Sequence, residues 1–445
     1  MLIDFFKKMK HVVILGVIFL LAQVPSTSAG QQSGKTIKLG IIGPLSFVAG
    51  EGIVQGATMA VEEINRSGGV QVGNKKYNVE IVKVDDNCLR SVSDAVSAME
   101  RLITVDKADF VIGGFHSESV LAQQDVIADH KIIFIDTGSA SLKQPSRLAK
   151  DFNRFKYYFR ININSIAAGR AMLGNAVMIA NKVREELGVK APRVALLLEK
   201  LLWVEPIVKL CQAKLPKMGM EVAGTWRPSS MATDLTAEWT AIKASKAHMV
   251  LQIASGPAGT VGPRQWGELQ VPAALFGTNI QAMQGGHWKT TNKKCNYEAT
   301  VCNLGPAEIT PKTLPFYDAF DKKYGGYLLY IVATVYDAVN VLTGAIERAG
   351  TLDSDTVVKE LEKTDFIGVI GRISFEPPGH KFPHIIRMTP GYCTLVGFQW
   401  IDGKQVVVWP DGRALLGDKR YVGLRYGGTK DYVLPPWMVK YWKVR

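Results

Sequence analysis

The stretch that decides the fold reads Ile37-Lys-Leu-Gly-Ile-Ile-Gly-Pro-Leu-Ser46, followed ten residues later by Gly56-Ala-Thr-Met-Ala-Val-Glu-Glu-Ile-Asn-Arg-Ser-Gly-Gly69. Residues 37–42 are apolar and β-branched and end at Gly43-Pro44, which predicts a short buried strand. Residues 51–65 carry apolar side chains at helical spacing, which predicts a helix. The helix is expected to end at Ser67-Gly68-Gly69, because glycine readily takes the positive φ that a helix end needs.

The same alternation of strand and helix patterns continues along most of the chain. Further strands are expected over 79–84, 110–112, 132–135, 157–161, 194–198, 222–225, 249–253 and 275–276, and helices over 92–104, 119–129, 166–187, 204–218, 235–244, 328–349 and 356–362. Strands that alternate with helices of this length predict βαβ units, parallel sheets and helices on both faces. We therefore expect two doubly wound α/β units, with a β-rich, aromatic tail from residue 392.

The first 29 residues have the three-part pattern of a cleaved secretory signal. Three lysines stand among residues 7–10, and residues 12–22 form an apolar run of eleven. A bilayer needs about 20 apolar residues, so this run is too short to be a membrane anchor. Thr27-Ser28-Ala29 then supplies the small residues that a signal peptidase requires, and no cysteine follows as a lipid attachment site. The mature chain is expected to be exported to the periplasm.

Composition is that of a globular chain with a positive balance of charge. The chain has 445 residues, of which 47% are hydrophobic and 21% charged, with a formal net charge of +13. This length allows two or three ordinary domains. A positive balance can indicate nucleic acid, but the basic residues are scattered among acids and form no long run. The preferred interpretation is a solvated basic surface, with no nucleic-acid partner.

The five cysteines and seven histidines do not form a recognisable metal motif. Export makes disulfides permissible, and Cys295 and Cys302 are the best candidate pair, in a polar, loop-like stretch. The odd number leaves at least one thiol free or paired between chains. His380 and His384 have helical spacing, but the prolines between residues 376 and 384 prevent a helix there. No metal or cofactor is expected.

Three glycine- and hydroxyl-rich loops follow strands of the first unit: 43–46, 113–119 and 136–141. Ligands of open parallel sheets bind beyond the carboxyl ends of the strands. Backbone N–H groups at helix starts, together with serine hydroxyls, can hold a carboxylate without a basic side chain. Such residues also cap helices and form turns in any protein. Three of these loops at one sheet edge favour a binding site.

Motifs for nucleotide binding and for catalysis are missing. No G-x-G-x-x-G follows the first strand, and the sequence has no G-x-x-x-x-G-K-[ST] and no G-x-S-x-G. His116, Ser117 and Glu118 stand side by side, but adjacent residues in a loop seldom converge on one atom as a catalytic triad does. The chain is therefore not expected to be an enzyme.

Four segments in a fixed order carry a family resemblance. They are Ile37 to Ser46, Gly56 to Gly69, Val84-Asp-Asp86 and Phe110-Val-Ile-Gly-Gly-Phe-His-Ser117. The chain resembles the leucine/isoleucine/valine-binding family of periplasmic receptors. The resemblance implies the type I periplasmic binding protein fold: two Rossmann-like lobes, joined by three crossing strands that act as a hinge.

The resemblance also implies lobe boundaries and partners. Lobe 1 is expected to comprise 34–161 and 304–370, and lobe 2 to comprise 162–303 and 371–445. A monomer is expected to close on a small ligand and to present one face to an ABC permease in the inner membrane.

Binding residues follow from the same resemblance. The carboxylate-binding serine of the family matches Ser117, and aromatic contacts of the second lobe match Ser255 and Trp203. The contacts after the fourth strand fall at Ser139, Ala140 and Ser141. Trp203 suits an aromatic or apolar ligand body, and an aromatic side chain between the lobes is an equally good interpretation.

Departures from the family concern the half of the site that recognises an amino group. The family's acidic residue aligns with Asn279, which cannot supply the charge that a buried ammonium group requires. The aromatic of the first loop falls at Ala49, with Phe47 nearby. Asp136 is a candidate replacement for the acid; otherwise the ligand is a carboxylate without an α-amino group, or an amide.

The sequence thus predicts the substrate-binding component of an ABC importer, which binds an amino acid or related small carboxylate between its lobes. One alternative is a soluble sensor with the same fold, which reports an amide or aromatic carboxylate to a regulatory partner. A second alternative, an exported enzyme, would have to show turnover.

Overall fold

The computed structural model describes residues 35–413 and 422–444. The predicted signal segment lies outside them. The strands are β1 (Lys35–Gly43), β2 (Val70–Val72), β3 (Lys75–Asp85), β4 (Phe110–Gly113), β5 (Phe134–Asp136), β6 (Tyr158–Arg160), β7 (Arg193–Leu198), β8 (Glu221–Trp226), β9 (Met249–Ala254), β10 (Ala274–Asn279), β11 (Ala299–Cys302), β12 (Phe366–Ile367), β13 (Arg372–Ile373), β14 (Val396–Ile401) and β15 (Lys404–Trp409).

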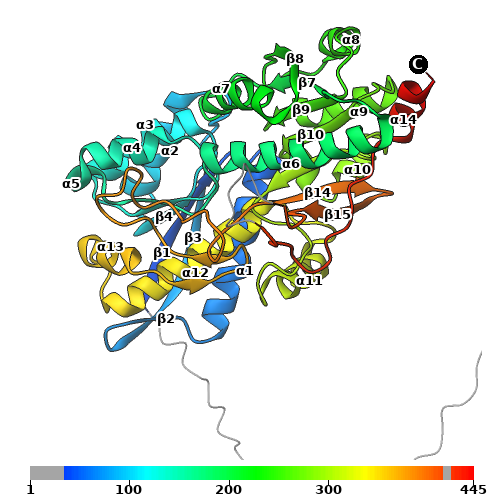
Figure 1. Ribbon diagram of the computed structural model, residues 1–445. Coiled ribbons are helices and arrows are strands. Elements are labelled where there is room, and N and C mark those ends of the chain that lie inside the picture. The colour runs from blue at the N-terminus through cyan, green and yellow to red at the C-terminus, as the bar shows by residue number, and fades with distance from the viewer. Residues whose placement is uncertain (1–34, 414–421, 445) are drawn as a thin grey trace, which may run out of the picture. The chain divides into compact units, whose positions relative to one another are not determined.

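The helices alternate with these strands through the first two thirds of the chain. They are α1 (Val48–Arg66), α2 (Val92–Thr104), α3 (Ser117–Asp129), α4 (Lys143–Lys150), α5 (Phe152–Phe155), α6 (Ser165–Leu187), α7 (Glu205–Lys214), α8 (Thr236–Ala244), α9 (Ala258–Glu268), α10 (His287–Thr290), α11 (Thr313–Tyr324), α12 (Tyr330–Ala349), α13 (Ser354–Glu362) and α14 (Pro436–Lys443) (Figure 1). Within the described residues, no helix combines the length and hydropathy needed to cross a bilayer.

The first sheet has six strands in the order β2-β3-β1-β4-β5-β6. All neighbours are parallel except β2, which pairs antiparallel with β3. From β1 the chain passes to β3 on one side and then returns to β4 on the other. The strand order therefore reverses between β1 and β4, and the loops that follow these two strands open at the position where α/β sheets bind ligands.

Helix α1 lies against α12, which joins this lobe from much later in the chain (Figure 1). The contact depends on Gly56, where a Cβ would lie 2.3 Å from the carbonyl oxygen of Val332. The segment that follows α1 also needs glycine. Gly69 has a φ of +79°, and its N–H donates to the Ile64 carbonyl at 2.9 Å. The two glycines of the opening motif thus fix a close helix contact and a turn.

The second sheet has four parallel strands in the order β10-β9-β7-β8. Here the order reverses between β7 and β9, so the loops after these two strands correspond to those after β1 and β4 in the first sheet. Strands β11, β14 and β15 form a separate antiparallel sheet, in which β14 pairs with both neighbours. Helix α6 packs on β9, β10 and β11, and α14 packs on α6.

The predicted alternation is confirmed, and the α/β fold with two parallel sheets is the one expected. Within the described residues, six α-helices were not predicted: α4, α5, α9, α10, α11 and α14. Pro263 lies inside α9, and Pro315 lies in the first turn of α11. The tail does contain β14 and β15, as predicted. It also contains helix α14, which was not predicted because the segment is rich in aromatic residues. The lobe boundaries and the three-strand hinge stay predictions.

The expected disulfide between Cys295 and Cys302 is not formed. All five cysteines lie in the described part of the chain, and all five are free and buried. The two thiols have different surroundings: the Cys302 thiol donates to the Leu304 carbonyl, whereas Cys295 lies beside His287 and Glu298. Burial raises the pKa of the Cys302 thiol, and that of Cys211, to about 12, so both are protonated at neutral pH.

Candidate functional site

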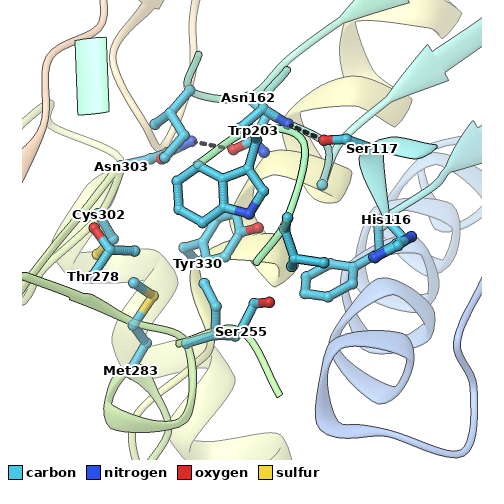
Figure 2. Close-up of a pocket in the computed structure, with 16 residues that line it drawn as sticks. His116, Ser117, Asn162, Trp203, Ser255, Thr278, Met283, Cys302, Asn303 and Tyr330 are labelled. Atoms are coloured by element: carbon cyan, nitrogen blue, oxygen red, sulfur yellow. Dashed lines mark hydrogen bonds between the residues drawn. The ribbon is translucent and has the colours of Figure 1, made fainter. Parts of the chain in front are cut away.

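A cavity is lined by residues that follow strands of both parallel sheets (Figure 2). It encloses about 490 Å³ between atoms, part of which is open to solvent. The lining residues are Phe115, His116, Ser117, Gly138, Ala140, Asn162, Ile163, Leu201, Trp203, Ser255, Thr278, Ile280, Met283, Cys302, Asn303 and Tyr330. The loops after β4, β7 and β9, which flank the reversals of strand order, all contribute to the lining, so the cavity lies where a ligand site is expected.

One wall of the cavity is the N-terminus of α3. Ser117 is its first residue, and the N-cap residue His116 makes no side-chain cap hydrogen bond. The Ser117 hydroxyl accepts from the backbone N–H groups of Ala140 and Ser141, at 3.4 and 3.3 Å. These bonds are long, and the helix end carries unpaired backbone donors with a partial positive charge. This wall is therefore suited to an anion.

The opposite wall is built by the loops after β7 and β9. Trp203 is 8% exposed, and Figure 2 shows its indole in the middle of the cavity, above Tyr330. Ser255 lines the cavity beneath it. Glu199 accepts from the Ser255 hydroxyl at 2.7 Å and from the Ser255 N–H at 2.8 Å. A buried carboxylate thus fixes one residue of this wall.

Glu199 is a site residue that the sequence reasoning missed. It is fully buried, and burial is the main reason that its pKa is raised to about 7. The nearby Glu118 charge raises the pKa further, while the bonds from Ser255 oppose the shift. The signal was present in the sequence, since an acid directly after an apolar strand stands at the ligand-binding edge of a sheet.

Two asparagines of the cavity lining, which come from distant parts of the chain, are joined by a hydrogen bond. Asn162 follows β6 and Asn303 follows β11, and the Asn303 amide donates to the Asn162 Oδ1 at 2.9 Å. The Asn162 amide in turn donates to the Ser139 carbonyl at 3.2 Å. The Oδ1 of Asn303 is buried and has no hydrogen-bond partner within the described residues. It is a free acceptor, which a ligand N–H or O–H can satisfy.

The lining of the cavity is electrically neutral. None of the lining residues, all of which are described, is Asp, Glu, Lys or Arg. Burial lowers the pKa of His116, which favours the uncharged imidazole despite the nearby Glu118 carboxylate. Apart from a partly exposed histidine, the cavity therefore offers hydrogen-bonding groups, apolar surface and the α3 N-terminus, and no full charge.

Four of the nine predicted ligand-binding residues line the cavity: Ser117, Ala140, Trp203 and Ser255. The other five, which are Phe47, Asp136, Ser139, Ser141 and Asn279, are not among the lining residues. Ser139 and Ser141 are buried behind Ala140 in the loop after β5. Phe47 lies instead under the Arg90 guanidinium, whose carbon is 5.7 Å from the ring centre.

Asp136, the predicted replacement for the family's acid, is engaged within the first lobe. Its carboxylate accepts from the Tyr158 hydroxyl at 2.7 Å, from the Ser139 hydroxyl and from the Gly138 N–H at 3.1 Å. Burial raises the pKa of Asp136, and the Arg160 guanidinium partly offsets that shift. The carboxylate is thus satisfied by its own loop and by Tyr158 of β6, and Asp136 is not among the residues that line the cavity.

Asn279 supports the wall from behind. Its amide donates to the Glu298 carboxylate at 2.6 Å and to the Gly259 carbonyl at 2.7 Å, and its Oδ1 accepts from Gln281 N at 3.1 Å. Its neighbours Thr278 and Ile280 line the cavity. Asn279, at the position where the family has an acidic residue, therefore stabilises the cavity wall in this chain.

Comparisons with known proteins agree with this geometry. Residues 36–390 match the model of a family described as periplasmic binding protein. The Leu/Ile/Val-binding protein homolog 7 of Brucella abortus is 25% identical over 420 residues, which cover 91% of this chain and 98% of that relative. The leucine-, isoleucine-, valine-, threonine- and alanine-binding protein of Pseudomonas aeruginosa is 24% identical over 379 residues, with 82% and 92% coverage.

Solved structures share the fold at low sequence identity. A solute-binding protein of an R. palustris ABC transporter, solved with benzoate, has a TM-score of 0.68 and 17% identity, and the match covers 84% of this chain and 95% of that one. A branched-chain amino acid transporter substrate-binding protein of Streptococcus pneumoniae, solved with isoleucine, has a TM-score of 0.68 and 22% identity, with 84% and 99% coverage. The chain combines two α/β sheets, a cavity at the carboxyl ends of their strands and a family match over most of its length. It therefore belongs to the leucine/isoleucine/valine-binding-like periplasmic binding proteins, a family of solute receptors and not of enzymes.

Proposed function

We propose that the chain binds a small carboxylate in this cavity and delivers it to an ABC permease in the inner membrane. The observation that carries the proposal is the pairing of the α3 N-terminus with a neutral lining. A carboxylate is the ligand group that such a wall stabilises best, because several backbone N–H groups and one hydroxyl can point at it.

Capture begins at Ser117. The long bonds from Ala140 N and Ser141 N to the Ser117 hydroxyl are easily exchanged for shorter bonds to a ligand carboxylate, which is the stronger acceptor. The freed hydroxyl then donates to the same carboxylate. Hinge closure excludes water and brings Trp203 and Ser255 of the second lobe onto the ligand. No bond in the ligand is broken at any stage.

The body of the ligand is expected to be aromatic or branched and apolar. Trp203 and Tyr330 present aromatic surface, and Ile163, Ile280 and Met283 complete an apolar wall. An α-ammonium group finds no carboxylate among the lining residues, and burying a cation without a counter-charge costs several kcal/mol. We therefore favour a carboxylate without an ammonium group over an amino acid. The benzoate complex of the R. palustris relative in fold makes aromatic acids the first class to test.

Ser117→Ala tests the proposal, with Ser119→Ala as its matched control. Ser119 lies two residues further along α3, is equally buried, and donates to the Cys88 carbonyl instead of facing the cavity. Calorimetric titration with benzoate and with branched aliphatic acids should show about tenfold or greater loss of affinity in Ser117→Ala, because a hydrogen bond to a charged group contributes roughly 1.5–3 kcal/mol. Equal affinities in both variants would contradict the proposal.

Delivery to a permease has its own test. Uptake of the bound acid by cells should fall when the chain is deleted and recover when it is restored. A cell that loses a transcriptional response but keeps uptake would favour the alternative role of a soluble sensor.

A further inference from the structure

His287, Cys295 and Glu298 bring three different metal-binding groups together behind the cavity wall. His287 is the first residue of α10, and the other two lie in the segment between α10 and β11. Their ligand atoms all lie within 4.8 Å of one another. The residues are 0%, 0% and 1% exposed, respectively. We propose that this cluster is a zinc site.

The donor set suits zinc better than the common alkaline-earth ions. Imidazole nitrogen, thiolate sulfur and carboxylate oxygen are the three protein ligands of Zn²⁺, whereas Mg²⁺ and Ca²⁺ require oxygen ligands. His287 Nε2 and Glu298 Oε2 are 2.8 Å apart. Two ligands of a tetrahedral zinc, each about 2.0–2.1 Å from the ion, lie roughly 3.3 Å apart. A shift of a few tenths of an ångström would therefore place a zinc ion between the two atoms.

Charge balance also points to a cation at this position. Glu298 is buried and accepts from the Asn279 amide and from His287, and within the described residues it forms no ion pair with Lys or Arg. A buried carboxylate needs a compensating positive charge. A proton shared between His287 and Glu298 would balance the negative charge of the carboxylate. Such a proton would not involve the third group, the Cys295 sulfur. A metal ion uses all three groups and leaves one coordination position for water.

The carboxylate of the cluster has the support that a metal ligand requires. The Asn279 amide holds the Glu298 carboxylate at 2.6 Å, as outer-sphere partners hold metal-binding carboxylates. The His287 carbonyl accepts from the Thr291 hydroxyl at 2.8 Å, which closes the turn after α10. Because the cluster is buried and the chain just before α10 carries Ile280 and Met283 to the cavity, the ion would have a structural role. It would fasten residues 280–298 behind the ligand-binding wall.

Metal content of the purified full chain tests the site. After incubation with excess Zn²⁺ and removal of weakly bound ion by a mild chelating resin, elemental analysis should find about one zinc per wild-type chain. Cys295→Ser and His287→Gln should retain less than a fifth of that amount. Cys211→Ser is the matched control, because Cys211 is a buried thiol that belongs to no cluster of three metal-binding groups among the described residues. It should retain the wild-type amount.

Cobalt substitution identifies the ligands independently of the variants' stability. Wild-type chain loaded with Co²⁺ should show the near-ultraviolet absorption of a cobalt–thiolate bond, and folded Cys295→Ser should not. A wild-type chain that takes up less than about a tenth of an equivalent of zinc overturns the proposal, whatever the variants do. Zinc uptake by Cys295→Ser and His287→Gln equal to that of the wild type also overturns it. None of these outcomes depends on which solute the cavity binds.

Discussion

Glu199 and Ser255 form a two-point contact that joins the loops after β7 and β9. One carboxylate oxygen accepts from the serine hydroxyl at 2.7 Å, and the other accepts from its backbone N–H at 2.8 Å. The two strands are neighbours in the second sheet, at the point where its strand order reverses. The contact therefore sets the height of Ser255 in the cavity wall, and Glu199 acts on the ligand through Ser255 and not by touching it.

Glu199→Gln is expected to weaken ligand binding about tenfold while the chain stays folded. A neutral amide can accept from only one of the two Ser255 donors, and its NH₂ group faces the other, so Ser255 must shift. Loss of one hydrogen bond to a charged acceptor corresponds to roughly 1.5 kcal/mol or more. Titration calorimetry measures the effect. Glu205→Gln is the control, since Glu205 pairs with Arg227 at a more exposed position and should bind like wild type. Wild-type affinity in Glu199→Gln would contradict the positioning role.

The same residue should make stability fall as pH rises. The folded-state pKa of Glu199 is about 7, against an ordinary value of 4.5, because burial disfavours the carboxylate. Between these values the folded chain holds a proton that the unfolded chain has released, so the unfolding free energy decreases from about pH 4.5 to pH 7. The difference in pKa corresponds to about 3 kcal/mol.

Urea unfolding at pH 5 and pH 8 measures this effect. Asp337, whose pKa burial also raises to about 7, contributes in the same direction in every variant. The quantity to compare is the decrease in unfolding free energy between pH 5 and pH 8. This decrease should be larger in wild type than in Glu199→Gln, by about 2–3 kcal/mol. Identical losses in the two proteins would show that Glu199 does not titrate as described.

Much of the fold could be predicted because most of the parallel strands are short and apolar, and two of them, β1 and β4, end in glycine. The helices over 92–104 and 166–187 were predicted to within one residue, since each has a clear start and an apolar stripe; Ser91 and Asn164 cap them. Helix α9 could not be predicted, because Gly262, Pro263 and Gly267 conceal its helical pattern. The helix forms because its buried face packs in the second lobe. Such tertiary packing cannot be predicted from the local sequence pattern.

The candidate site was predicted less completely, for a physical reason. Ser117 begins the helix after β4, and Trp203 lies in the loop after β7, so both are at the carboxyl ends of parallel strands. This position brings them to the cavity. Asn279 also lies at the end of a parallel strand, but its amide donates a hydrogen bond to Glu298, nineteen positions later, which does not line the cavity. Glu199 was overlooked because its partner, Ser255, lies 56 residues later, in the loop after another strand. Pairings between distant segments decide which side chains face the cavity, and sequence spacing does not encode them.

Asn279→Asp is expected to destabilise the chain and to confer no affinity for amino acids. The new carboxylate would stand against Glu298 and the Gly259 carbonyl, in place of the two hydrogen bonds that the amide donates. Removing such bonds and adding a buried like charge should cost about 3 kcal/mol or more in unfolding free energy. Asn340→Asp, at a half-buried helix position, should cost less than about 1 kcal/mol. A stable Asn279→Asp chain that binds leucine would show that this position still faces the ligand.

Gly56→Ala tests the contact between α1 and α12. The added methyl group would meet the Val332 carbonyl oxygen at 2.3 Å, so the helices must separate, and overpacking of this kind costs about 1–3 kcal/mol or more. Gly344→Ala in α12 is the control, because the new methyl group would approach only the flexible end of Arg348. That variant should be neutral or more stable by up to about 1 kcal/mol. Equal stabilities of the two variants in urea would refute the close approach.

The central claim is that the cavity recognises a carboxylate through neutral groups, and a thermal unfolding series of matched acids and amides tests it most directly. Benzoate, branched aliphatic acids, their amides and the corresponding amino acids would each be added to the wild-type chain. We predict that at least one acid without an ammonium group raises the unfolding temperature, with stabilisation of about 2.7 kcal/mol at a hundred times its Kd, and that its amide does not. Equal stabilisation by acid and amide, or stabilisation by amino acids alone, would contradict the account.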